Sequence, residues 1–432
     1  MNYKETLDFL FAQLPMYQRV GKAAYKADLA TTLELDKYFQ HPHKSYKTIH
    51  VGGTNGKGSV SHCIASIFQE AGYKVGLYTS PHLKDFRERI RINGQMITEN
   101  AVIDFVNNHQ GIIKKLQPSF FEMSVAMAFD YFRHEKVDVA IVEVGMGGRL
   151  DSTNIISPEI STITNIGMDH TAFLGDTLPK IAIEKSGIIK KDVPVIIGQS
   201  QAETSLVFEN IAKERETNIL FADKELAIST ATFSIDEKQI FQIYRGTELA
   251  YPDLKLDLLG SYQKKNIITA LCTIEQLQKG AFQISNQDIY KGLLNVVKNT
   301  GLLGRWQHLG YNPRIICDTG HNLDGMTMLV EQIKNTPHDK LHIVLGMVND
   351  KDHSAVLNIL PKNAEYYFTK ASIPRSLDEQ ELKQMGNQIG LVGESFSNVE
   401  LALKSAQKNA GSNDLIFIGG STFIVADILE KY

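Results

Sequence analysis

One short apolar segment, residues 137–144, constrains the fold more than any other part of the sequence. It is rich in β-branched residues and almost continuously apolar. It is too short for a typical helix, so it predicts a strand that is buried on both faces. Similar runs at 48–51, 74–79 and 160–164 alternate with helical patterns such as 60–71. This alternation predicts a parallel sheet covered by helices, in an α/β fold.

The length of 432 residues suggests more than one domain. From about 217 to 258, short alternating strands and polar turns predict a small antiparallel extension of the first domain. The strand–helix alternation restarts after residue 301, with strands expected at 315–317, 342–345, 366–369 and 415–418. We therefore expect a larger domain over residues 1–298 and a smaller, Rossmann-like α/β domain over residues 299–432.

Composition excludes several classes of protein. Lys and Arg total 45 against 49 Asp and Glu, and this net charge of -4 lacks the basic excess of a nucleic-acid coat. The three cysteines form no C-x-x-C pair, which argues against a disulfide framework or a zinc knuckle. The sequence has no apolar run of about 18 residues and no apolar signal segment near its start. We expect a cytoplasmic monomer that binds neither nucleic acid nor membranes.

A glycine-rich loop, Gly52 to Ser59, follows the first expected strand and opens an amphipathic helix. Backbone N–H groups and a helix N-terminus in such a loop can face phosphate oxygens. The usual G-x-x-x-x-G-K-[ST] pattern does not match, because Val51 stands where its first glycine is required. The alternative is a purely structural turn. The expected phosphate ligands are Thr54, Asn55, Gly56, Lys57, Gly58 and Ser59.

Several motifs follow the loop in order over roughly residues 50–325. They are GTNGKGS (53–59), TSPHL (79–83), ERIRING (88–94), EVGMGGRLDSTN (143–154), NIGMDH (165–170), EKSGIIK (184–190) and DTGHN (318–322). Together they resemble the folylpolyglutamate synthase/dihydrofolate synthase family, which belongs to the wider Mur ligase group of ATP-dependent amide-forming ligases. The sequence departs from the family pattern at Leu303 and Leu323, where proline is common.

The resemblance implies that the chain adds L-glutamate to dihydropteroate, to the glutamate tail of reduced folates, or to both. It also implies that residues 1–298 form an ATP-binding, P-loop-type domain like that of Mur ligases. ATP there converts a carboxylate into an acyl phosphate, which an amine then attacks. Two alternatives remain open: a folylpolyglutamate synthase without the dihydropteroate activity, and another Mur-type amino-acid ligase. A nucleotide-binding module without catalysis is disfavoured, because so many polar groups suited to phosphate chemistry occur together.

The resemblance further implies bound magnesium, with two Mg²⁺ ions expected. The matching positions Ser80, Glu143 and His170 each lie where an expected strand ends, as ligand sites in α/β sheets do. Serine and glutamate supply the oxygen ligands that magnesium prefers, whereas histidine is an unusual magnesium ligand. For Glu143 the alternative is a buried carboxylate paired with an arginine or a helix.

Lys185 matches the lysine that is typically carbamylated in the resembled family. A carbamate turns this cation into an anionic oxygen ligand that can help to hold a second Mg²⁺. The alternative is an ordinary surface lysine with an apolar stem. By resemblance we expect Lys57, His170 and Lys185 to take part in catalysis.

The remaining expected contacts involve the nucleotide and the folate. By resemblance, Arg305 reaches the ATP phosphates, Asp318 the nucleotide and Asn266 the adenine end, in a site divided between two domains. For Arg305 the alternative is an interdomain salt bridge. The expected ligands of folate or pteroate are Ser119, Phe121, Leu150, Asp151 and Ser152. Phe121 can stack on a flat ring, although a core aromatic is an equal alternative. Residues 21–29 are a candidate lid.

Overall fold

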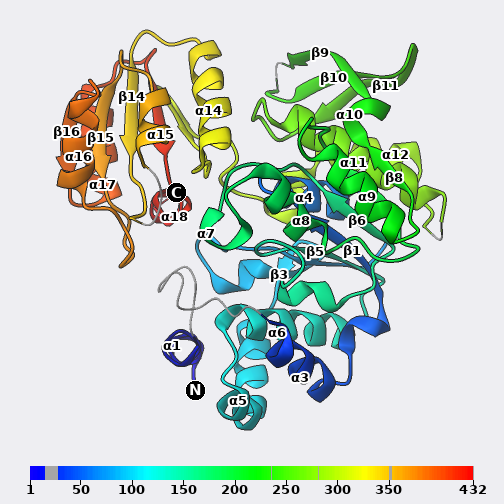
Figure 1. Cartoon of the computed structure of the whole chain (residues 1–432). Helices are drawn as coiled ribbons and strands as arrows, with labels where there is room; N and C mark the ends of the chain where they lie inside the picture. The colour runs from blue at the N-terminus through cyan, green and yellow to red at the C-terminus, as the bar shows by residue number, and fades with distance from the viewer. Residues whose placement is uncertain (15–27, 235, 281, 350–352, 432) are drawn as a thin grey trace. The chain divides into compact units, whose positions relative to one another are not determined.

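The computed structural model in Figure 1 describes residues 1–14, 28–234, 236–280, 282–349 and 353–431. The candidate lid at 21–29 therefore lies almost entirely outside the described residues. The chain divides into two compact units. The first comprises Met1–His82, Phe86–Leu258 and Gln263–Leu302, and the second comprises Leu83–Asp85, Leu259–Tyr262 and Leu303–Tyr432. The single domain boundary at 298/299 remains a prediction. It differs from the division into compact units, because the chain passes from one unit to the other several times.

The first unit is built on a mostly parallel sheet with the strand order β4-β3-β2-β5-β1-β6-β7-β8. The four runs predicted as strands are present, as β1, β2, β5 and β6, and β3 and β4 run antiparallel at one edge. The strands are β1 (Lys47–Gly52), β2 (Val75–Tyr78), β3 (Ile90–Ile92), β4 (Gln95–Met96), β5 (Val139–Glu143), β6 (Ile160–Ile163), β7 (Val195–Ile197) and β8 (Ile219–Phe221).

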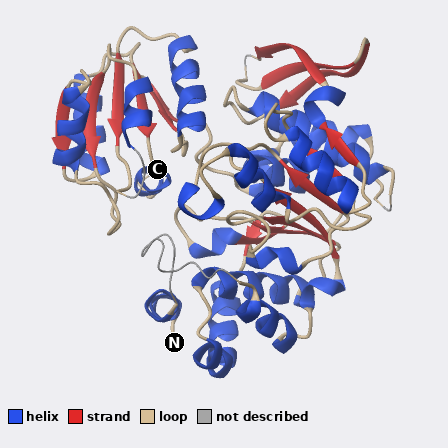
Figure 2. Ribbon diagram, viewed as in Figure 1, coloured by secondary structure: helices blue, strands red, loops and turns tan. Residues whose placement is uncertain are grey.

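Helices cover both faces of this sheet (Figure 2), as the apolar strands require. Ile141 of β5 packs in a core with α4 and α11, whereas its neighbour Val142 packs in a second core with α5 and α6. Successive strand residues point to opposite faces, so these two cores lie on opposite sides of the sheet. The helices are α1 (Tyr3–Gln13), α3 (Ala30–Tyr38), α4 (Lys57–Glu70), α5 (Glu99–Leu116), α6 (Phe120–His134), α7 (Thr171–Leu174), α8 (Leu178–Ser186), α9 (Ser205–Glu214), α10 (Ala222–Glu225), α11 (Gln263–Gln278), α12 (Asn286–Leu294) and α13 (Val296–Thr300), with 3₁₀ turns η2 (Pro42–Ser45), η3 (Phe86–Arg89) and η4 (Ser152–Ile155).

The predicted antiparallel extension is a three-stranded sheet of β9 (Ala227–Phe233), β10 (Gln239–Arg245) and β11 (Glu248–Leu256). It is shorter than predicted at its start. The segment Ile219–Phe221 was included in the extension, but it is β8 and pairs in parallel with β7 of the main sheet. A short apolar run suits both a strand of the parallel sheet and a strand of the antiparallel extension, so periodicity alone cannot distinguish the two.

The second unit is a smaller α/β domain, as predicted. Its sheet has the order β12-β13-β17-β14-β15-β16, and all pairs are parallel except β12 with β13. The strands β12 and β16 were not predicted. The elements are β12 (Gln307–Tyr311), β13 (Arg314–Cys317), α14 (Leu323–Asn335), β14 (Leu341–Leu345), α15 (His353–Ile359), β15 (Glu365–Thr369), α16 (Glu379–Gln388), β16 (Gly393–Phe396), α17 (Val399–Asn409), β17 (Leu415–Gly419) and α18 (Thr422–Leu429).

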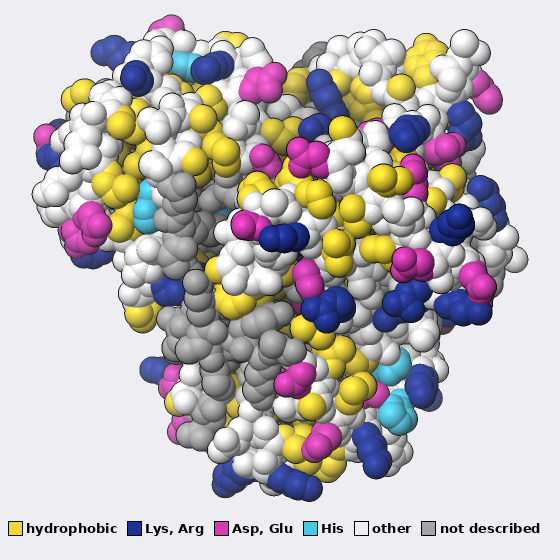
Figure 3. All heavy atoms as spheres, viewed as in Figure 1, with side chains coloured by type: hydrophobic (Ala, Val, Ile, Leu, Met, Phe, Trp, Pro, Cys, Tyr) yellow, Lys and Arg dark blue, Asp and Glu magenta, His cyan; other side chains and the backbone are white. Residues whose placement is uncertain are grey.

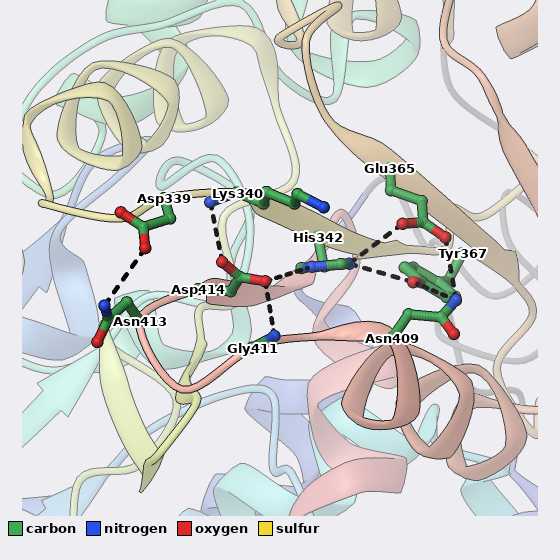
Figure 4. Close-up of polar contacts among 9 residues, drawn as sticks. All are labelled: Asp339, Lys340, His342, Glu365, Tyr367, Asn409, Gly411, Asn413 and Asp414. Carbon is green, nitrogen blue, oxygen red and sulfur yellow. Dashed lines mark hydrogen bonds and ion pairs between the residues drawn. The ribbon is translucent and has the colours of Figure 1, made fainter.

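A buried polar network links β14 and β15 of this second sheet to Asp414, the residue before β17 (Figure 4). His342 of β14 lies between Asp414, whose Oδ2 is 3.2 Å from Nε2, and the Tyr367 hydroxyl, which is 3.1 Å from Nδ1. Asp414 also accepts hydrogen bonds from the backbone N–H groups of Gly411 and Lys340. Burial opposes ionisation of Asp414, but these hydrogen bonds outweigh it and hold its pKa below the usual value.

We expect Asp414→Asn to lower the melting temperature at pH 7 by about 2–4 °C, because it removes a charge-assisted acceptor from several donors. A lowered carboxyl pKa contributes stability that is present above the unfolded-state value and is lost as the pH falls through the folded-state value. The difference between wild type and variant should therefore shrink as the pH falls below about 4. Thermal melts of both proteins at several pH values measure it. A difference that grows in acid would contradict the assignment.

Charged side chains of both signs are interspersed on the face drawn in Figure 3, in keeping with the net charge of -4. Within the described residues, no helix is long and apolar enough to cross a membrane. Because the protein has no excess of positive charge, the positive charge that a polyanionic ligand requires must be supplied by groups at the binding site.

Candidate active site

The glycine-rich loop joins β1 to α4, and its backbone leaves the N-terminus of the helix open. Gly56 is the N-cap in a left-handed conformation, with φ of 85°, and no side chain caps it. Gly53 also has positive φ, and a Cβ there would lie 1.9 Å from Thr164 Oγ1. Both glycines are required by this geometry, which leaves backbone N–H groups at the start of α4 for an anion.

The next strand, β6, holds the loop in place. Asn165 follows it, and its side-chain oxygen accepts a hydrogen bond from the Asn55 N–H at 2.8 Å, while its backbone oxygen accepts one from Thr54 N–H at 2.9 Å. The Thr164 hydroxyl donates to the Asn55 carbonyl at 2.5 Å. Because β6 lies beside β1, the polar residues at its end reach the loop directly. Asn165 lies within the NIGMDH motif, but its support of the loop was not predicted.

Two lysines converge on this loop. Lys57 folds back, so that its ammonium donates to the carbonyls of Gly53 and Thr54, each at 3.1 Å. Lys185 of α8 donates to the same Gly53 carbonyl at 2.9 Å. The lysine side chains therefore share one acceptor, although they are far apart in the sequence.

Lys185 is buried, with 4% of its surface exposed, so the surface-lysine alternative is wrong. Burial and the positive charge of Lys57 lower the pKa of Lys185 to about 7. An appreciable fraction of this side chain is therefore a neutral amine near neutral pH. A neutral amine is the form that reacts with carbon dioxide.

The expected magnesium ligands follow neighbouring strands of the same sheet. Glu143 ends β5 and is 4% exposed, and its carboxylate accepts a hydrogen bond from the Ser80 N–H at 3.1 Å, just beyond β2. Ser80 is half-buried, and so is His170, which caps α7 in a left-handed conformation beyond β6. The strands β2, β5, β1 and β6 are consecutive in the sheet, so these side chains belong to one edge of it. Two oxygen-bearing side chains at this edge fit the ligand preference of magnesium.

Arg89 lies near Glu143 and was missed as a site residue. It is 3% exposed, its Nε donates to His82 Nδ1 at 2.8 Å, and its charge lies within the electrostatic reach of Glu143. Its position directly before the fully buried strand β3 could have indicated a buried arginine that needs a partner. The alternative of an arginine-balanced carboxylate at Glu143 therefore stays open.

Comparison with known proteins decides the family. The profile of the Mur ligase middle domain matches residues 51–274, and that of the "Mur ligase, glutamate ligase domain" matches residues 304–422. A dihydrofolate synthase/folylpolyglutamate synthase of Bacillus subtilis is 31% identical over 430 residues, which cover 95% of this chain and 96% of that protein. The chain belongs to the folylpolyglutamate synthase/dihydrofolate synthase family of Mur ligases. The predicted class of enzyme, an ATP-dependent amide-bond-forming ligase, is confirmed.

Other members of this family extend the likeness. The chain covers 50% of a Haloferax volcanii protein named a probable bifunctional folylpolyglutamate synthase/dihydropteroate synthase, at 31% identity, so it spans half the length of that relative. Among solved structures, Escherichia coli FolC in complex with DHPP and ADP has a TM-score of 0.85 at 28% identity, covering 100% of this chain and 97% of that one. A Yersinia pestis bifunctional synthase complexed with AMPPNP and a Mn ion has a TM-score of 0.83 at 26% identity, covering 100% and 98%. The predicted fold is confirmed.

The ligase places Asn266 beside the phosphate loop. Its side chain is buried and donates to Gln263, whose own amide donates to the Ser59 hydroxyl. A Cβ on Gly56 would lie 2.2 Å from Asn266 Oδ1. The expected contact of Asn266 with the adenine end stays a prediction, and a role in supporting the loop is visible in the structure.

In the second unit, Asp318 is held by protein groups. It is 3% exposed and accepts hydrogen bonds from the Tyr262 hydroxyl at 2.5 Å, the Trp306 N–H at 2.7 Å and the Gly320 N–H at 2.8 Å. Burial raises its pKa. Arg305 is half-buried and its guanidinium contacts the Thr319 hydroxyl. Their contacts with ATP stay predictions.

The residues expected to bind folate have clear local roles in the first unit. Ser119 is the N-cap of α6 and forms a capping box with Glu122. The buried Asp151 caps η4 and accepts a hydrogen bond from the Met146 N–H at 2.8 Å, while Ser152 is buried and Leu150 is half-buried. Phe121 is half-buried, packs against Tyr78 and lies against Gly145. These contacts bring Phe121 and Asp151 to the same glycine, and their contact with a folate stays a prediction.

Proposed function

We propose that this ligase adds L-glutamate to dihydropteroate, to the glutamate tail of reduced folates, or to both, through an acyl phosphate made from ATP. The observation that supports this most directly is the convergence of Lys57 and Lys185 on the Gly53 carbonyl, at an open helix N-terminus beside the strand that ends in Glu143. This arrangement suits a polyphosphate placed next to a reacting carboxylate. The named relatives support folate-type substrates.

Each group then has a definite task. The N–H groups at the start of α4 bind phosphate oxygens, and the Lys57 ammonium neutralises the charge that shifts as the phosphoryl group is transferred. Arg305 and Asp318 are proposed nucleotide ligands, and Phe121 and Asp151 proposed folate ligands. His170 and Lys185 are proposed to orient the reacting groups. We also propose that the protein is monomeric and cytoplasmic.

Ser80, Glu143 and His170 are proposed to hold Mg²⁺, and Lys185 to help with a second ion. When bound, such ions supply positive charge that stabilises the phosphate oxygens and the developing negative charge. The buried Glu143 carboxylate and the adjacent Ser80 fit this role, since magnesium prefers oxygen ligands. The Mn ion bound to the Yersinia pestis relative supports a divalent ion.

A ligation assay tests the substrate assignment. Purified protein is incubated with ATP, Mg²⁺, L-glutamate and either dihydropteroate or tetrahydrofolate, and products are separated by mass. We expect a glutamylated product from each acceptor. Product from tetrahydrofolate alone would remove the dihydropteroate half of the proposal and leave the folylpolyglutamate synthase. Product from neither, with turnover of UDP-linked peptides, would favour another Mur-type ligase.

Carbamylation of Lys185 is a separate prediction. The neutral amine attacks carbon dioxide, a C–N bond forms as one C=O π bond breaks, and one proton leaves to solvent, so that the neutral amine becomes an anionic carbamate. Native mass spectrometry in bicarbonate buffer should detect a species about 44 Da heavier, the mass of one added carbon dioxide. Lys185→Met should lack it, and Lys190→Met, which changes another partly buried lysine nearby in the sequence, should keep it. An unmodified wild-type mass in bicarbonate buffer would contradict the prediction.

The pH dependence of stability provides a further prediction for Lys185 in bicarbonate-free buffer. Its pKa is about 7 in the folded protein, against the ordinary lysine pKa of 10.5 in the unfolded chain, so the unfolded state binds more protons between these two pH values. Stability should therefore rise with pH across this window, as the penalty of burying a cation is relieved. Lys185→Met should lose this component. Urea denaturation of both proteins at pH 7 and pH 9.5 measures it, and equal pH dependence in the two would contradict the assigned burial effect.

A further inference from the structure

A group of polar side chains lies outside the phosphate site, where α3 ends and η2 begins. Asp36 is in the last turn of α3, His41 is the N-cap of η2, and His43 lies within η2. One possible ligand atom from each lies within 4.8 Å of the others. His41 Nδ1 is 2.5 Å from Asp36 Oδ2, and His43 Nε2 is 3.3 Å from Asp36 Oδ1. The two imidazoles therefore face different oxygens of one carboxylate.

This carboxylate requires a positive charge nearby. Asp36 is 6% exposed, and its Oδ1 accepts no hydrogen bond from the described residues. Its position in the last turn of a helix also places it at the negative end of the helix dipole. Within the described part of the chain, its ion pairs are with His41 and His43 and with no lysine or arginine. The compensating charge must therefore come from protonated imidazoles or from a bound cation.

The backbone holds the three side chains ready for a ligand. His41 adopts a left-handed conformation, with φ of 52°, and its N–H donates to the Asp36 carbonyl at 2.8 Å. The ring of His43 is buried and lies 6.0 Å from the ring of Phe129 on α6, measured between centroids. The His41 side chain is 45% exposed, so solvent reaches the group from that side. The buried side chains of Asp36 and His43 are thus held in place, whereas the exposed side chain of His41 can move.

We propose that Asp36, His41 and His43 form a Zn²⁺ site, with water in the fourth position. Two imidazoles and a carboxylate are a common zinc ligand set, and nitrogen donors disfavour magnesium. Ligands about 2 Å from a tetrahedral zinc ion lie roughly 3.3 Å apart. The His43–Asp36 separation already matches this value, and the exposed His41 has room to move outward. A bound ion would tie the end of α3 to η2, which leads directly into β1 and the phosphate loop.

Isothermal titration of the full-length, chelator-treated protein with Zn²⁺ tests the site. We expect one equivalent that depends on His41, so that His41→Ala weakens its Kd by at least about tenfold. The matched control is His134→Ala. His134 also lies near a carboxylate, Asp130, but that carboxylate already contacts Arg133. This control should bind Zn²⁺ like wild type, and Mg²⁺ should show no His41-dependent binding.

Two further measurements separate this site from the proposed magnesium ligands and from misfolding. Glu143→Ala should keep the His41-dependent zinc equivalent. The visible absorption of Co²⁺ bound in place of zinc should be lost in His41→Ala but not in His134→Ala. Because the His41 side chain is 45% exposed, its replacement removes little packing from the core. Equal zinc affinity in wild type and His41→Ala, or loss of the equivalent in Glu143→Ala, would overturn the proposal.

Discussion

Glu143→Ala is expected to lower kcat for ligation by roughly 100-fold or more while the protein stays folded. The carboxylate ends β5, is 4% exposed, and accepts a hydrogen bond from the Ser80 N–H. Removing it takes away a buried proposed magnesium ligand and one of the negative charges that act on Arg89. Glutamate-dependent formation of ADP at saturating ATP and Mg²⁺ measures the loss.

The matched control is Glu159→Ala. Glu159 precedes β6 at the opposite end of the sheet, is about 41% exposed and forms an ion pair only with the half-buried Lys47 among the described residues. Its loss should change the rate little, since exposed ion pairs contribute little. Glu143→Gln separates charge from shape, because it keeps the side-chain length without the negative charge. A normal rate in Glu143→Ala would overturn the magnesium assignment, and a rate restored in Glu143→Gln would indicate a hydrogen-bonding role instead.

Lys57→Met should lower kcat by roughly 100- to 1,000-fold, the range seen when one charge-stabilising group is removed. Methionine keeps an apolar stem but cannot donate to the carbonyls of Gly53 and Thr54. The variant therefore loses a positive charge at the phosphates and also the bonds that fold the side chain onto the loop. If Lys57 acts on the transferred phosphoryl group, kcat should fall more than the KM for ATP rises.

Lys47→Met is the control for this variant, because the half-buried Lys47 starts the same strand that leads into the loop. It should retain nearly full activity. A change in the KM for ATP alone in Lys57→Met would show that the lysine contributes only to binding. Unchanged kcat and KM in this variant would remove Lys57 from the site altogether.

Much of the architecture was predictable because the strands are short, apolar and separated by helices of normal periodicity. Within the segment 137–144, residues Val139–Glu143 form β5 and are all buried, and the loop at 52–59 joins a strand to a helix. The prediction of strand pairing was wrong where a short apolar run suits both a parallel and an antiparallel sheet. The segment Ile219–Phe221 pairs with the parallel sheet, and strands such as β16, with half-exposed residues, gave too weak a pattern.

The site was predictable in its residue types more than in its contacts. Lysines and carboxylates at strand ends and in a glycine-rich loop carry a local signal, because phosphate binding requires those groups in that order. The support of the loop by Asn165 and the burial of Lys185 depend on which distant segments become neighbours. A lysine on a helix looks the same in sequence whether it faces water or the carbonyl of Gly53.

Because the chain passes between the two units several times, recombination between family members cannot exchange the smaller unit as one continuous segment. Tyr262, whose hydroxyl donates to Asp318, and Leu259, whose carbonyl accepts from Gln332, both precede the long C-terminal segment of that unit. A fragment of residues 303–432 would lack both contacts and leave the buried Asp318 without one of its donors. Recombination between family members at a single junction would therefore pair Asp318 of one parent with the tyrosine position of the other. Chimaeras that remain folded should therefore take Tyr262 and Asp318 from the same parent.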